Sequence, residues 1–177
     1  MSSMVLQLAR GVRQRAALVR NPNLHLEPKA IFHPSSRVRK SAGRVSVGAT
    51  AAVGKDCLFH AQTTIGRGTL IASRVAFLNR DEHDFSDPTK PIRLSKGLRS
   101  GKIVIGDDCW IGFGVVLLAP VSIGRGVVVA AGSVVTRDLP DLCVAAGQPA
   151  RPVRPRFSPS QVEVYDRSFD VDGTWFV

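Results

Sequence analysis

A six-residue repeat of aliphatic or aromatic residues runs through most of this 177-residue chain and limits what it can fold into. The repeat forms two ladders: Val47, Val53, Phe59, Ile65, Ile71 and Phe77, then Ile105, Ile111, Leu117, Ile123, Val129 and Val135. Four positions after nearly every ladder residue stands a small or Val-sized side chain, such as Cys57 or Val115. A short fixed repeat builds a stacked array, in which each unit buries its apolar face against its neighbours. The sequence therefore predicts a scaffold of coils, and we expect chemistry where the repeat is interrupted.

The length of the repeat also predicts the shape of one coil. Three repeats make eighteen residues, which suits a triangular turn with a short strand on each side. Residues 47–64 and 65–82 then form two turns, and residues 105–122 and 123–140 form two more. Residues 24–46 are expected to form an irregular first coil. The predicted fold class is all-β, with a mainly aliphatic core because aromatic residues make up only 6% of the chain.

A polar insertion over residues 83–104 separates the two pairs of turns. Its charged and titratable residues are His83, Asp84, Asp87, Lys90, Arg93, Lys96, Arg99 and Lys102. Segments of this length without internal structure are usually functional or disordered. We therefore expect a loop that protrudes from the core and carries function.

The two ends of the chain depart from the repeat. Apolar residues at helical spacing predict a basic amphipathic helix over residues 4–20, within an N-terminal segment 1–23. Such a helix suits a cap on the open end of the array, and its charge also suits a transit peptide or peripheral association with a membrane. The array is expected to span residues 24–154. Residues 155–177 are expected to form a C-terminal tail that docks on the molecule.

Composition narrows the classes of partner. The net charge of +10 favours anionic partners, but few aromatic residues are available for base stacking and no nucleic-acid motif is present, so nucleic acid is disfavoured. The three cysteines are expected to be buried reduced thiols of a cytoplasmic protein, since two of them occupy the small positions of the repeat. No apolar run approaches the ~20 residues of a membrane-spanning helix.

Several motifs give a specific resemblance over roughly residues 45–154. They are Ile105-Gly-Asp-Asp-Cys-Trp-Ile-Gly112, Val121-Ser-Ile-Gly124, Ala131-Gly-Ser-Val-Val-Thr-Arg-Asp-Leu-Pro140 and Ala146-Gly-Gln-Pro-Ala-Arg151. Together with the His83 loop, they resemble the hexapeptide-repeat acyltransferases, especially the maltose, galactoside and exopolysaccharide O-acetyltransferases. The resemblance implies a single-stranded left-handed parallel β-helix and a homotrimer with its active sites between subunits. The left hand comes from the resemblance alone, because parallel crossovers are otherwise nearly always right-handed.

The resemblance also assigns a catalytic residue. His83 matches the histidine that activates the acceptor hydroxyl in the family. A sugar hydroxyl is hardly ionised at neutral pH, and an imidazole is well matched to removing its proton during attack on a thioester. Asp81, Glu82 or Asp84 is a candidate to orient the ring, and a backbone N–H near residues 112–113 is the candidate donor to the oxyanion.

The remaining site residues divide between acetyl-CoA and the acceptor. The resemblance implies that the co-substrate contacts are Trp110, Ala131, Gly132, Ser133, Thr136, Arg137 and Arg151, with Arg154 a further candidate at the adenosine end. Arginines suit that end because a guanidinium binds phosphate oxygens in pairs. Asn79, Asp84 and Arg93 are candidate acceptor contacts by loop location. The upstream Asn and Asp of the galactoside enzymes have no convincing match here.

The sequence thus predicts a cytoplasmic, homotrimeric, acetyl-CoA-dependent O-acetyltransferase that acts on a sugar or glycan-precursor hydroxyl, as in polysaccharide biosynthesis. Transfer is expected to be direct, without an acyl-enzyme and without a metal. A zinc enzyme of the carbonic anhydrase type shares the scaffold, but the four histidines lack the close pair that it needs. A non-enzymatic assembly module and an N-acetyltransferase acting on an amino-sugar or amino-acid amine remain the alternatives.

Overall fold

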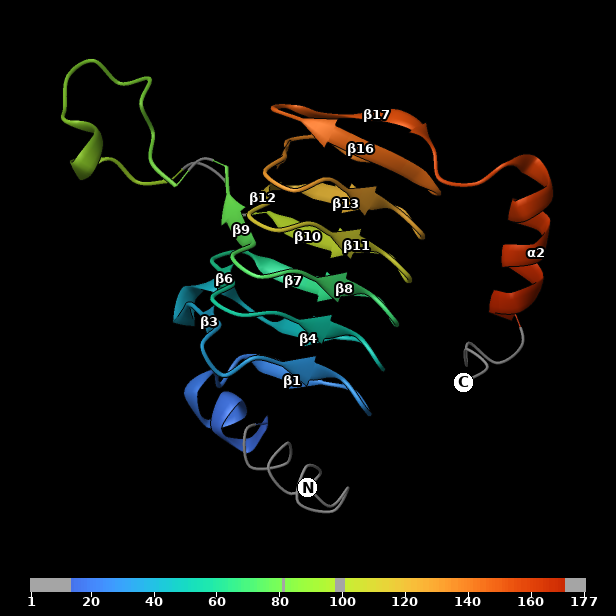
Figure 1. Cartoon of the computed structure of the whole chain (residues 1–177). Helices are drawn as coiled ribbons and strands as arrows, with labels where there is room; N and C mark the ends of the chain where they lie inside the picture. The colour runs from blue at the N-terminus through green and yellow to red at the C-terminus, as the bar shows by residue number, and fades with distance from the viewer. Residues whose placement is uncertain (1–13, 81, 98–100, 171–177) are drawn as a thin grey trace.

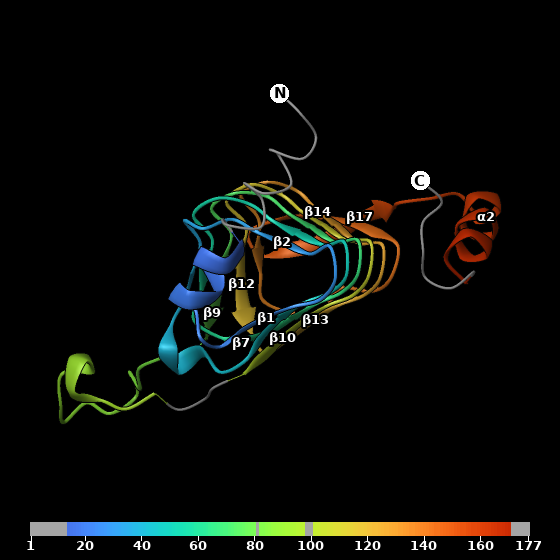
Figure 2. The same cartoon turned by 90° about the horizontal axis from the view of Figure 1, so that it is seen from below.

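Three parallel β-sheets form the sides of a triangular prism in the computed structural model, which describes residues 14–80, 82–97 and 101–170 (Figures 1 and 2). The first sheet contains β1 (Leu24–Leu26), β4 (Val45–Val47), β7 (Gln62–Ile65), β10 (Lys102–Ile105) and β13 (Val121–Ile123). The second contains β2 (Ile31–Phe32), β5 (Ala52–Val53), β8 (Leu70–Ile71), β11 (Trp110–Ile111), β14 (Val128–Val129), β16 (Cys143–Gly147) and β17 (Ala150–Pro155). The third contains β3 (Arg37–Val38), β6 (Leu58–Phe59), β9 (Ala76–Asn79), β12 (Val116–Ala119) and β15 (Val134–Val135).

Successive strands enter the three sheets in turn, so each coil contributes one strand to each side, as in a left-handed parallel β-helix. The predicted fold is confirmed. The usual right-handed rule for parallel crossovers rests on the twist of the strands. Strands β1 to β15 contain only two to four residues each, too few to accumulate much twist.

The sixfold repeat sets which side chains face the interior of this stack of coils. Because side chains alternate across a strand, one residue of each two-residue strand points inward, and alternate residues do so in longer strands such as β4 and β10. Val47, Ile65, Ile105 and Ile123 lie in register on the first sheet, and every residue of the two predicted ladders is at most 2% exposed. Phe59 stacks on Phe77 with 4.2 Å between ring centroids. Burial of both ladders confirms the predicted core.

Close approach of neighbouring coils explains the glycines that follow many ladder residues. A Cβ atom on Gly48 would lie 2.8 Å from the backbone nitrogen of Arg67, in the next coil. A Cβ on Gly112 would lie 2.6 Å from the backbone nitrogen of Ala131. Since backbone atoms cannot yield as a flexible side chain would, these positions favour glycine.

The first coil is more regular than predicted. It contains β1, β2 and β3, and the short 3₁₀ helix η1 (Lys40–Ala42) follows it before β4 begins. Residues 14–20 are helical and lie against this coil: Ala17 is fully buried, and its carbonyl accepts a hydrogen bond from Asn21 Nδ2 at 2.8 Å. Asn21 Oδ1 accepts the backbone N–H of Val38 at 2.7 Å. The predicted helix 4–20 is thus observed over 14–20, and residues 1–13 lie outside the described residues.

The polar insertion begins and ends earlier than predicted. It connects β9 to β10 and so occupies residues 80–101, rather than 83–104, because the strands on both sides of it continue the ladder pairing. We refer to residues 80–101 as the loop. It contains the short 3₁₀ helix η2 (Ile92–Leu94) and projects from the stack (Figure 1).

The C-terminal end differs most from the prediction. Strand β17 turns back antiparallel to β16 and extends to Pro155, so the predicted boundary at residue 154 falls inside a strand. Helix α2 (Pro159–Asp170) follows, on the side of the stack opposite the loop (Figures 1 and 2). Ser158 and Gln161 cap it reciprocally, the Gln161 side chain accepting the Ser158 N–H at 2.9 Å. This S-x-x-Q pattern with proline at the first helical position is a helix-start signal that the sequence analysis missed.

Arg156 and Tyr165 hold the tail against the stack. Arg156 Nη1 donates to Asp108 Oδ2 at 2.9 Å and to the carbonyl of Gly126 at 3.0 Å. Tyr165 is 7% exposed, and Arg125 pairs with the carboxylate of Asp166 at 2.6 Å. The tail therefore docks, as expected, although residues 171–177 are outside the described part of the chain. Within the described residues, no helix has the length and apolar character to cross a membrane.

Candidate active site

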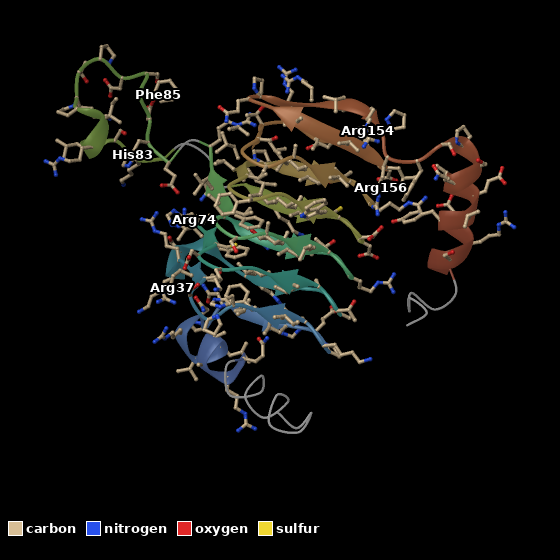
Figure 3. All side chains as sticks on the ribbon, viewed as in Figure 1. Arg37, Arg74, His83, Phe85, Arg154 and Arg156 are labelled. Carbon is tan, nitrogen blue, oxygen red and sulfur yellow. The ribbon has the colours of Figure 1, made fainter. Side chains whose placement is uncertain are left out.

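His83 is exposed on the loop, away from the coils (Figure 3). Its Nδ1 atom lies 3.4 Å from the carbonyl oxygen of Ser95, on the returning half of the loop. The Ser95 hydroxyl donates in turn to the carbonyl of Ile92 at 2.6 Å, and Ser95 is buried. A carbonyl beside Nδ1 favours the tautomer that carries its proton there. Nε2 is then left as the basic nitrogen.

The acidic neighbours of His83 are bound to other groups. Asp84 accepts hydrogen bonds from the Ser86 hydroxyl at 2.6 Å and the Ser86 N–H at 2.9 Å, and these bonds lower the pKa of the Asp84 carboxyl. Glu82 Oε2 lies 3.6 Å from Nη1 of Arg39, and Glu82 Oε1 lies 3.8 Å from Nδ1 of His60. Arg39 belongs to the first coil and His60 to the second. Among the described acids, none is hydrogen-bonded to His83, and Asp81 is outside the described residues.

Asn79 and Arg80 fix the base of the loop. Asn79 Nδ2 donates to the carbonyl of His60 at 3.0 Å, and Asn79 Oδ1 accepts the N–H of Gly101 at 3.2 Å. Arg80 donates to the carbonyl of Thr136, two coils further along the stack. The predicted acceptor residue Asn79 thus joins the two ends of the loop. Arg80, which the sequence analysis did not single out, joins the loop to a predicted co-substrate residue.

Trp110 lies on the outer face of the second sheet. It pairs in register with Leu70 and Val128, and 53% of its surface is exposed. Nearby, the N–H of Gly112 is already donated to the carbonyl of Val129 at 2.8 Å, within the hydrogen bonds that join coils. Of the two predicted oxyanion donors, the N–H of Phe113 is therefore the better candidate.

The predicted co-substrate stretch Ala131–Ser133 forms one corner of the stack. Ala131 and Gly132 are exposed, and the Gly132 carbonyl accepts a hydrogen bond from Gln148 Nε2 at 2.6 Å. Ser133 differs: it is 2% exposed, and its hydroxyl accepts the N–H of Gly147 at 3.2 Å. Ser133 therefore shapes this corner from inside. Its side chain is not presented to solvent.

The predicted phosphate-binding arginines are exposed and have few partners. Arg137 is exposed at the end of the last complete coil. Arg151 is exposed on β17, and its Nη1 donates to the adjacent Ala150 carbonyl at 2.7 Å. Arg154 similarly contacts the Pro155 carbonyl at 3.1 Å. Arg156 is instead bound to Asp108 and Gly126. Arg137, Arg151 and Arg154 thus present cationic groups to solvent, as a phosphate site requires.

One chain does not bring all these residues together. The loop with His83 leaves the corner between the third and first sheets, whereas Trp110 lies on the second sheet, which forms the opposite side. The geometry within a single chain therefore separates the predicted base from the predicted lining of the acyl groove.

The cysteines are unsuited to nucleophilic catalysis. Cys57, Cys109 and Cys143 are free and buried, which confirms the predicted thiols. Burial raises the pKa of all three, that of Cys109 to about 12. A thiol that keeps its proton is a poor nucleophile. Among the described residues, no group of three His, Cys, Asp or Glu side chains is placed to hold a metal ion.

Comparison with known proteins agrees with this architecture. The family model "Bacterial transferase hexapeptide (six repeats)" matches residues 102–137. A solved hexapeptide-repeat acetyltransferase of Vibrio cholerae superposes with a TM-score of 0.68 and 27% identity, over 89% of this chain and 95% of that one. The same Vibrio protein has also been solved in complex with acetyl coenzyme A.

Curated relatives match in sequence as well. A putative lipopolysaccharide biosynthesis O-acetyl transferase of Escherichia coli, WbbJ, is 41% identical over 96 residues, which are 51% of this chain and 49% of that protein. The galactoside O-acetyltransferase of Lactococcus lactis is 35% identical over 91 residues, which are 51% of this chain and 44% of the relative. The chain thus spans about half the length of these relatives. The repeat, the coil architecture and these matches together show the hexapeptide-repeat fold and a sequence similarity to the hexapeptide-repeat transferases.

Proposed function

We propose that this protein is an acetyl-CoA-dependent O-acetyltransferase that acts on a sugar or glycan-precursor hydroxyl in the cytoplasm, with His83 as the general base. The observation that carries the proposal is the state of His83. It stands exposed on a projecting loop, with Nδ1 facing a backbone carbonyl, and among the described residues Nε2 has no hydrogen-bond partner. Galactoside and lipopolysaccharide O-acetyltransferases among the relatives support the choice of reaction.

The proposed reaction gives each of these groups a role. Acetyl-CoA supplies an acetyl group held as a thioester. His83 Nε2 removes the acceptor proton while the hydroxyl oxygen attacks the thioester carbonyl. Phe113 is half-exposed, and its N–H would stabilise the oxyanion. The His83 imidazolium then returns its proton to the departing CoA thiolate, so no acyl-enzyme is needed and the protonated thiols of the core take no part.

The exposed residues of the upper coils fit the co-substrate. Trp110 offers an apolar surface for the acyl end, and Ala131 and Gly132 form an exposed corner along which an extended pantetheine chain would lie. Arg137 and Arg151 would bind phosphate oxygens. Ser133 acts by shaping the corner, since its side chain is buried.

A homotrimer would complete the site. The outward residues of the second sheet are apolar over several coils, as at Leu70, Trp110 and Val128, and the third sheet exposes Leu58. The outward residues of the first sheet include Ser46 and Ser122, which are polar. Packing of copies through the second and third sheets would cover the apolar faces and bring the loop of one copy toward Trp110 of the next.

The test is a CoA-release assay with acetyl-CoA and a panel of sugars and nucleotide-sugars, on the wild type and His83→Ala. Loss of a general base is expected to reduce kcat by about 10²–10⁴-fold. Acetyl-CoA affinity and the unfolding midpoint should be unchanged, because the hydrogen bond of His83 within the described residues is to Ser95 of the same loop. His25→Ala, on β1, is the matched control.

A subunit-mixing experiment tests whether the active site lies between two copies of the chain. If the site lies between copies, mixed trimers of His83→Ala and Trp110→Ala chains should recover activity that neither variant has alone. A wild type that binds no acetyl-CoA would overturn the proposed function and favour an assembly module. Turnover of amines but not hydroxyls would instead establish the N-acetyltransferase alternative.

A further inference from the structure

The described carboxylates of the loop are all engaged with groups of the protein. Glu82 faces Arg39 and His60 of the stack. Asp84 is bound by Ser86, and Asp87 by Thr89 and by Lys90, whose Nζ lies 2.9 Å away. None of these three carboxylates is ion-paired with Arg93 or Lys96. The described part of the loop also has more cations than carboxylates, with four Arg or Lys residues against three acids.

Arg93 and Lys96 carry that surplus. Both are exposed, and among the described residues neither has a carboxylate within ion-pair distance. This is in contrast to Lys90 on the same loop, which is neutralised by Asp87. An unpaired Arg and Lys offer hydrogen-bond donors without acceptors, which is the donor set that suits an anion.

The fold of the loop places the backbone at these two residues close to His83. The 3₁₀ helix η2 contains Arg93, and the Ser95 that follows it faces the His83 ring. One residue further, the carbonyl of Lys96 accepts the N–H of Asp84 at 3.2 Å. The two halves of the loop are thus bridged at two adjacent positions, His83–Ser95 and Asp84–Lys96, so the predicted base and the two cationic residues belong to one small structural unit.

We infer that the acceptor hydroxyl belongs to an anionic saccharide, one bearing a carboxylate or a phosphate close to the reacting hydroxyl, and that Arg93 and Lys96 bind this negative group. The inference rests on the proposed function and specifies its substrate class. It assigns Lys96 a binding role beside Arg93, and it gives Asp84 the role of a turn residue rather than an acceptor contact. A neutral sugar would leave both cations without a counter-charge.

The experiment compares acceptors that share one sugar ring and differ only at carbon 6, which carries a hydroxyl, a carboxylate or a phosphate. Binding is measured by calorimetric titration of glucose, glucuronate and glucose 6-phosphate into the full-length protein with saturating CoA, and kcat/KM is measured with acetyl-CoA and the same three compounds. The charged compounds should bind at least about tenfold more tightly than glucose, the equivalent of 1.4 kcal/mol. The preference should weaken as salt is raised, because exposed charges are screened.

The variants are Arg93→Gln, Lys96→Gln and the double variant, with Lys90→Gln as the matched control because its charge is already paired within the loop. Each of the first two should weaken binding of the charged compounds by about three- to tenfold, the double variant by more, and none should change the affinity for CoA. Comparing glucuronate with glucose 6-phosphate shows whether the site prefers a carboxylate or a phosphate. Rescue by Arg93→Lys would show that charge, rather than loop structure, is responsible.

Equal binding of neutral and charged compounds, or equal losses in Lys90→Gln and the double variant, would overturn the inference and leave the proposed function standing. Failure of the wild type to bind CoA would overturn the proposed function. In that case the same titrations, repeated without CoA, would decide whether Arg93 and Lys96 bind an anion.

Discussion

The stack and the loop differ in how they treat apolar side chains: the stack buries them and the loop exposes them. In the stack, Phe59 and the other ladder residues are fully or almost fully buried, and backbone hydrogen bonds join each coil to the next. In the loop, Phe85 is 74% exposed and Leu94 is 62% exposed, and the contacts are short-range turns. Stability is thus concentrated where the repeat is intact, and we propose that the interruption carries the chemistry.

Removing a phenylalanine ring from the stack and from the loop should give the largest difference in the free energy of unfolding. Phe59→Ala is expected to lower the free energy of unfolding by about 3–5 kcal/mol, because the ring is packed between Phe32 and Phe77 and its loss leaves a cavity. Phe85→Ala should change it by less than about 0.5 kcal/mol, because an exposed side chain has little packing to lose. Urea denaturation monitored by circular dichroism measures both. A large loss in Phe85→Ala would mean that the loop is part of the core of an assembly.

Alkaline pH should weaken the stack rather than the loop. Burial raises the pKa of Cys109 from 9.0 to about 12, so above pH 9 the unfolded chain loses a proton that the folded chain retains. The free energy of unfolding should therefore fall as pH rises from about 9 toward 12, by up to about 1.4 kcal/mol per pH unit for this group. Denaturation at several pH values between 8 and 10.5 tests this.

Cys109→Val is the matched variant, because valine occupies the equivalent position at Val115 and Val127. The variant should show a shallower decline in stability above pH 9. Part of the slope should remain, since burial also raises the pKa of Cys57. The same slope in both proteins would contradict the assignment to Cys109.

The tail gives the smallest expected effect. Arg156→Ala should cost about 1–2 kcal/mol, because it removes the bonds to Asp108 and Gly126 and leaves their oxygens without this donor. Hydrogen exchange should speed up in α2, with little change in the coils. Arg154→Ala, whose guanidinium contacts only the Pro155 carbonyl among the described residues, should stay within about 0.5 kcal/mol of the wild type. Uniformly faster exchange throughout the stack would show that α2 is not a separate unit.

Most of the fold could be read from the sequence, but less of the site. The repeat predicted the inward residues, and the motif beginning at Ile105 predicted the family. The sequence did not predict that Asn79 would join the two ends of the loop, or that the Asp84 carboxylate would be hydrogen-bonded to Ser86. Loop location alone suggested acceptor contacts at both positions. The side chains found closer partners within the chain.

What the sequence by itself determined is the periodic part of the molecule. In a stack of coils, a residue's spacing from its neighbours decides whether it faces in or out, so Val53 or Cys57 can be placed without knowing the rest of the chain. Only the tertiary structure decided which coils share a contact. Arg80 meets Thr136 and Arg156 meets Asp108 across 56 and 48 residues of sequence. Such pairings depend on how many coils lie between two positions and on where the chain leaves the stack, and no local pattern of residues records either.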